Sequence, residues 1–155
     1  MQTRRHLLSN SARLAALLAA AGVLPGIAFA QAAGYNQAAF DAKTIAETMK
    51  ALGASAPVES KDVTLTAPDI AENGAVVPVG ASTVLPGAKR LLLLVEKNPA
   101  ALAALFEVSD LVEANISTRV KMGQTSDVYA VAMMNDGKVL FARKEVKVTL
   151  GGCGG

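Results

Sequence analysis

The sequence predicts a mostly β protein: an immunoglobulin-like antiparallel β-sandwich with one N-terminal helix and a flexible C-terminal Gly-Gly-Cys-Gly-Gly arm. Three observations lead to this prediction. Apolar residues recur at helical spacing over residues 36–52, about seven short segments of strand character follow, and glycines surround the single cysteine at the end. We expect an export signal over 1–30 that is cleaved, a helix and linker over 31–60, the sandwich over 61–150 and the arm over 151–155.

Residues 1–30 have the pattern of a bacterial export signal. Arg4 and Arg5 form a twin-arginine pair, an apolar stretch follows over 14–24, and residues 28–30 form a small-x-small cleavage site. A transmembrane anchor is less favoured, because the apolar stretch is shorter than the roughly 20 residues that a span needs. An ordinary secretory signal is the other alternative. The twin-arginine pattern predicts export to the periplasm.

Cleavage of the signal changes the charge balance and removes the only histidine. The full chain has 15 Lys+Arg against 13 Asp+Glu, and three of the basic residues lie in the signal, which leaves 12 against 13, a net charge of −1. This balance argues against a protein that binds nucleic acid or an acidic membrane surface. Loss of His6 and the presence of one cysteine exclude His-based nucleophile pairs and histidine or thiolate-cage metal sites. We therefore expect no catalytic residue and no metal.

The helix is expected to begin after Asn36 and to end near residue 52. Its apolar residues fall on one helical face: Ala38, Ile45, Met49 and Leu52. The side chain of Asn36 can cap the first turn, and Gly53 is typical of a helix end. Residues 54–60, which include a proline, are interpreted as a linker.

Strands are expected over 61–66, 75–81, 89–96, 115–122, 127–134 and 139–150, with 100–108 ambiguous between helix and strand. Three short sequences predict turns: Asn73-Gly74, Pro86-Gly87 and Asn135-Asp136-Gly137. Pro78 suggests a strand at a sheet edge. The runs 90–95 and 128–134 are apolar on both faces, which we interpret as a large partner interface. The alternative is that they are two central strands of one sandwich.

The most informative segment is Gly151-Gly152-Cys153-Gly154-Gly155, which follows the last strand. Glycines give the backbone wide conformational freedom, and five extended residues reach roughly 17 Å. A thiol on such an arm can enter a narrow cleft of another protein, but its own fold does not hold it in a fixed position. The pattern favours a carrier over an enzyme. The alternative is an exported interaction module in which Cys153 forms an intermolecular disulfide.

Several stretches of the chain are similar to a known family. They are the terminal arm, residues 67–74 followed by 76–79, residues 96–99, and residues 147–149. Together with the twin-arginine signal, they resemble the SoxY family of the periplasmic Sox thiosulfate-oxidation system. The resemblance implies an immunoglobulin-type sandwich that forms a heterodimer with SoxZ, a smaller β-sandwich protein.

The resemblance also implies a chemistry. Cys153 would be the site of covalent sulfur attachment, and the four glycines around it would form the arm that enters each enzyme. A c-type cytochrome enzyme would join thiosulfate oxidatively to the cysteine sulfur. A hydrolase would release sulfate, and a molybdenum-haem sulfane dehydrogenase would oxidise the sulfur that remains. The only bound group would be the sulfur species on Cys153.

Overall fold

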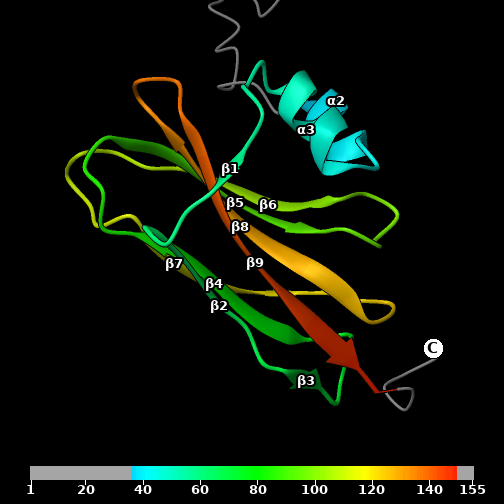
Figure 1. Ribbon diagram of the computed structural model, residues 1–155. Helices are drawn as coiled ribbons and strands as arrows, with labels where there is room; N and C mark the ends of the chain where they lie inside the picture. The colour runs from blue at the N-terminus through cyan, green and yellow to red at the C-terminus, as the bar shows by residue number, and fades with distance from the viewer. Residues whose placement is uncertain (1–35, 150–155) are drawn as a thin grey trace, which may run out of the picture. The chain divides into compact units, whose positions relative to one another are not determined.

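The computed structural model describes residues 36–149, which form two short helices followed by a two-sheet β-sandwich (Figure 1). The helical segment contains two short helices, α2 (Gln37–Asp41) and α3 (Ile45–Ala51). Asn36 caps α2 as predicted, because its side-chain oxygen accepts from the N–H of Ala39 at 3.1 Å. Gly53, at φ +66°, ends the second helix as predicted.

The prediction of one continuous helix is wrong, and the reason is a second cap. The backbone becomes extended at Ala42, where ψ is 134°. Thr44 then accepts a hydrogen bond from the N–H of Glu47 at 3.2 Å, and the Glu47 carboxylate accepts one from the N–H of Lys43 at 3.0 Å. A threonine followed three residues later by a glutamate is a capping-box sequence. This local signal outweighs the helical spacing that runs across it.

The strands are β1 (Val58–Glu59), β2 (Val63–Thr66), β3 (Ile70–Ala71), β4 (Val77–Thr83), β5 (Ala88–Val95), β6 (Leu102–Glu107), β7 (Asn115–Val120), β8 (Ser126–Met134) and β9 (Val139–Val148). The larger sheet has the order β1-β9-β8-β5-β6, with β3 also paired to β9, and the smaller has the order β2-β4-β7. Strands β1 and β3 run parallel to β9, and all other pairs are antiparallel. The predicted sandwich is confirmed.

Three details of the sheets differ from the expectation. The ambiguous segment 100–108 contains strand β6, which pairs with β5 at the edge of the larger sheet. In a constant-type immunoglobulin domain, the strand that follows the third one joins the other sheet, which here would mean pairing with β7. Strand β1 lies in the stretch interpreted as a linker. Strand β4 is the middle strand of its sheet, but β2 pairs with it only as far as Gly80. Pro78 therefore has a strand neighbour on one side only, which suits a residue without an N–H.

Strand β5 shows why the apolar runs are buried on both faces. Leu91, Leu93 and Val95 pack into the core between the two sheets. Leu92 and Leu94 point to the opposite face and pack with residues of α2 and α3. All five side chains are fully buried within this chain.

The interpretation of these runs as a partner interface is therefore wrong. Residues 91–95 and 128–132 are buried inside the chain, one face by the smaller sheet and the other by the two helices. The helices cover a sheet face that would otherwise be exposed. The alternative, two central strands of one sandwich, is confirmed.

The connections between strands sort into two ends of the sandwich (Figure 1). We call one the C-terminal end, which holds the last residues of β9 and the loops 67–76, 96–101 and 121–125. We call the other the far end, which holds the loops 84–87, 108–114 and 135–138. The predicted turns at Gly87 and Gly137, with φ of +79° and +85°, both lie at the far end.

Candidate functional site

The predicted site residues lie outside the residues that the structure describes: Cys153, Gly151, Gly152, Gly154 and Gly155. The last described residue is Thr149, four positions before the cysteine. The structure thus describes the place from which the predicted arm starts. We call this place the arm root, and define it as residues 147–149 with the loop residues that contact them.

Hydrogen bonds on both sides hold the last residues of β9. On one side, the N–H of Lys147 donates to the carbonyl of Asp69 at 3.0 Å, and the N–H of Thr149 donates to the carbonyl of Ala71 at 3.2 Å. On the other side, the N–H of Val148 donates to the Oγ1 of Thr125 at 3.0 Å. Strand ends usually fray, but this one has partners as far as Thr149.

A charged pair reinforces the same contact. The Nζ of Lys144 donates to the carbonyl oxygen of Ala67 at 2.8 Å and lies 2.8 Å from Oδ1 of Asp69. The hydrogen bond and positive charge of Lys144, with a smaller contribution from the charge of Lys147, hold the pKa of the Asp69 carboxyl below its usual 3.8. The loop before β4 is thereby tied to β9 through side chains as well as backbone.

Gly74 allows this loop to lie close against its neighbours. The carbonyl of Gly74 accepts from the N–H of Met122 at 2.7 Å. A Cβ at position 74 would collide with the carbonyl oxygen of Met122 and lie 2.9 Å from Cγ1 of Val148. The predicted turn at Asn73-Gly74 is present, since the N–H of Val76 donates to the carbonyl of Asn73 at 3.2 Å. It also packs directly on the last strand, which the turn sequence did not predict.

The loop over 96–101 reaches the same end of the sandwich. The Nδ2 of Asn98 donates to the carbonyl of Lys121 at 2.7 Å, and the N–H of Lys97 donates to the Oγ of Ser126 at 3.0 Å. These bonds join this loop to the loop that precedes β8. That second loop carries the threonine that holds the last strand.

The stretches similar to the SoxY family thus meet in one place. Residues 67–74, 96–99 and 147–149 lie at the C-terminal end, residues 76–79 lead from it into β4, and the contacts above connect them. Sequence reasoning singled out these stretches without assigning them a role. It predicted neither the bond of Thr125 nor that of Lys144, because these bonds join residues 23 and 77 positions apart in the chain.

The arm root supplies anchoring groups and contains neither a thiol nor an imidazole among its described residues. Residues 36–149 contain neither cysteine nor histidine. Within this part of the chain, no group of three or more His, Cys, Asp or Glu side chains could hold a metal ion. No helix among the described residues is long and apolar enough to cross a membrane. Chemistry at the predicted thiol therefore has no imidazole or second thiol in the described fold to draw on.

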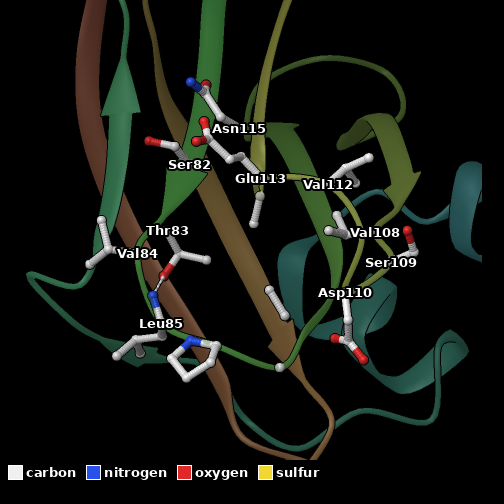
Figure 2. A pocket seen from close by; sticks show the side chains of 14 residues that line it. Ser82, Thr83, Val84, Leu85, Val108, Ser109, Asp110, Val112, Glu113 and Asn115 are labelled. Atoms are coloured by element: carbon white, nitrogen blue, oxygen red, sulfur yellow. Dashed lines mark hydrogen bonds between the residues drawn. The ribbon is translucent and has the colours of Figure 1, made fainter.

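A pocket of about 640 Å³ opens at the far end of the sandwich. Figure 2 shows it between the loops 84–87 and 108–114, with the carboxylates of Asp110 and Glu113 among its lining side chains. The N–H of Leu85 donates to the hydroxyl of Thr83 at 3.2 Å beside it. The lining residues include no basic side chain. The pocket is separated from the arm root by the length of the strands.

A comparison with protein families identifies the chain. The profile of the family described as sulfur oxidation protein SoxY matches residues 48–153, which is more than half of the sequence. This chain belongs to the SoxY family. The matched region of this SoxY-family chain runs from α3 to the predicted attachment residue. No curated protein matches the sequence.

Solved structures support the same assignment. The sulfur carrier protein SoxY from Chlorobium limicola f thiosulfatophilum is 37% identical to this SoxY-family chain, with a TM-score of 0.56 over 62% of this chain and 87% of that one. A superoxide reductase (neelaredoxin) variant from Ignicoccus hospitalis has a TM-score of 0.51 at 19% identity, over 56% of this chain and 79% of that one. At this low identity, the second likeness shows a shared sandwich fold alone.

Proposed function

We propose that this SoxY-family chain carries sulfur intermediates covalently on Cys153 while thiosulfate is oxidised to sulfate. The observation that carries the proposal is the place of the only cysteine, among four glycines and four residues after a strand end that is bonded on both sides. The family match supports it, as does the likeness to a protein described as a sulfur carrier. A fixed root and a glycine arm suit a group that moves between enzymes.

The proposed loading step forms one S–S bond. The Cys153 thiol and thiosulfate join through the outer sulfur of thiosulfate, and the reaction releases one proton and two electrons. A c-type cytochrome enzyme accepts the electrons, and the product is a cysteine S-thiosulfonate. Water then breaks the bond between the outer sulfur and the sulfonate group on a hydrolase, so that sulfate leaves and a persulfide stays on Cys153. A sulfane dehydrogenase oxidises this persulfide sulfur further.

The proposal also includes a partner protein and a cellular compartment. The chain forms a heterodimer with a SoxZ-like β-sandwich protein and works in the periplasm after export by the twin-arginine route. The twin-arginine pair at residues 4–5 supports the compartment. Glycines on both sides of Cys153 leave no side chain to obstruct a narrow cleft, which supports a passive role for the arm and leaves catalysis to the enzymes that receive it.

Replacement of Cys153 by serine tests the proposal. The variant should lose thiosulfate-dependent electron transfer to the cytochrome completely, because the hydroxyl forms no bond to sulfur under these conditions. Intact mass spectrometry of the periplasmic protein should show reductant-labile additions of sulfur or of a thiosulfonate group on the unmodified sequence. The same spectra report whether cleavage follows Ala30.

An unchanged circular dichroism spectrum would show that the serine variant is folded. The competing hypothesis, an interaction module tethered by a disulfide, predicts normal electron transfer in that variant. It also predicts one disulfide mass and no sulfur additions. Either result would overturn the carrier proposal.

A further inference from the structure

We infer that Ile70 and Val76, two exposed apolar residues beside the arm root, form the surface on which the cleft rim of each arm-receiving enzyme docks. The inference rests on the proposed carrier function. It assigns a docking site on the folded part of the chain, and it identifies the occupant as an enzyme surface with apolar side chains at the mouth of a cleft.

The shortness of the arm makes contact at the root unavoidable. Cys153 lies four residues beyond Thr149, which is roughly 14 Å of fully extended chain. Thr149 itself is bonded to the loop at Ala71 and cannot follow the arm without losing that bond. A cysteine that reaches the bottom of a cleft therefore brings the rim of that cleft against the surface around Thr149.

Among the described residues, Ile70 and Val76 are the large apolar side chains exposed on that surface. Ile70 is 57% exposed and pairs with Lys147 in the register of β3 and β9. Val76 is 50% exposed and follows the turn at Gly74, which packs on the side chain of Val148. The backbone bonds of the loop hold both residues in place, so that docking orders little additional chain.

The other exposed large apolar side chains within residues 36–149 cannot serve this purpose. They are Val58, Val84, Leu111 and Val112, and all lie at the far end, near the start of β9. Strand β9 has 10 residues, so that the two ends are roughly 30 Å apart. An enzyme that takes the arm into its cleft meets the C-terminal end first. Single exposed apolar residues are ordinary on protein surfaces, but these two lie where a short arm forces contact.

A double substitution tests the inference with the full-length chain, its SoxZ-like partner and the thiosulfate-loading cytochrome. Ile70→Thr with Val76→Thr keeps both residues β-branched and removes the apolar surface. The matched control is Val84→Thr with Val112→Thr at the far end. The KM of the cytochrome for the Ile70/Val76 variant should rise about ten-fold, as expected for the loss of two half-buried aliphatic side chains. Its kcat should not change, and the control should behave as wild type.

Two further readouts separate docking from other effects. The rate at which the Cys153 thiol reacts with a small aromatic disulfide should be the same in all variants, because a small reagent needs no docking surface. A photo-activated cross-linking residue at position 70 should attach to the cytochrome, and one at position 84 should not.

Each contrary result has a definite meaning. Equal KM values for the Ile70/Val76 variant and the control would overturn the inference and leave the carrier function intact. Loss of the SoxZ-like partner from the Ile70/Val76 variant would assign the surface to the heterodimer instead, which also overturns it. Normal electron transfer in the Cys153→Ser chain would overturn the carrier function itself.

Discussion

Lys144 connects two segments that the sequence places far apart. Its ammonium group bonds to the carbonyl of Ala67 and to the carboxylate of Asp69, both in the loop that lies against the last strand. The Asp69 side chain is 87% exposed, so that water screens the pair strongly. The pair therefore contributes more to the position of the loop than to the free energy of unfolding.

The charge of Lys144 gives a measurable titration at Asp69. The pKa of this carboxyl is lowered in the fold, so any stability that the pair contributes is present above pH 3.8 and is lost as the pH falls through the lowered pKa. Carbon-detected NMR should show Asp69 titrating below its usual value in the wild type. In a Lys144→Met variant its pKa should rise toward that value, since the hydrogen bond and the main charge are removed. An unchanged titration in that variant would contradict the assignment.

Among single residues, the sequence predicted the thiol but not the groups that hold its strand. A cysteine among four glycines is visible in the sequence itself. A threonine hydroxyl that accepts from a backbone N–H, as Thr125 does for Val148, depends on how two distant segments meet. No local pattern distinguishes Thr125 from the exposed Thr64 of β2.

Among the elements, the contact between the loop 67–76 and β9 depends on Gly74. Substitution of Gly74 by alanine should reduce the free energy of unfolding by about 1–3 kcal/mol, the usual cost of overpacking, because the new Cβ meets the Met122 carbonyl and Val148. Gly123→Ala is the matched control, since no atom lies within 4 Å of a Cβ there. Urea unfolding curves of the two variants provide the measurement. Equal curves would show that the loop moves away from β9 at little cost.

Element prediction succeeded where one local pattern dominates and failed where two compete. Alternation identified β7, and a continuous apolar run identified β5 as a strand, although the burial of both its faces was attributed to a partner. The helical segment failed because its apolar spacing continues across Thr44, although the capping-box residues were present in the sequence. Strands β1 and β3 have two residues each, too few for a period to appear, and they are strands only because β9 lies beside them.

For the whole molecule, the larger sheet is buried on both faces. The two helices cover one face, and the smaller sheet covers the other. Both faces of β5 are buried, so Leu92→Ala and Leu93→Ala should each reduce the free energy of unfolding by about 2–5 kcal/mol. Leu111→Ala is the control, because Leu111 is 94% exposed and its loss should change stability by at most about 0.5 kcal/mol. Denaturant unfolding of the isolated chain measures all three.

The comparison of the two buried leucines also tests the role of the helices. A partner interface on the outer face would leave Leu92→Ala neutral in the isolated chain and costly only in a complex. Equal losses for Leu92→Ala and Leu93→Ala would show that α2 and α3 belong to the same cooperative unit as the sandwich.

The pairing of β9 on both sides has a mechanical consequence. Under the proposed carrier function, an enzyme that holds the arm would pull on Thr149 along the axis of β9. The hydrogen bonds to β8 and to β3 lie across that axis, so the pull loads many of them together in shear instead of opening them one at a time. The charged pair at Lys144 and the Thr125 hydroxyl resist the same displacement. We therefore expect the sandwich to stay folded when such a pull acts on Thr149.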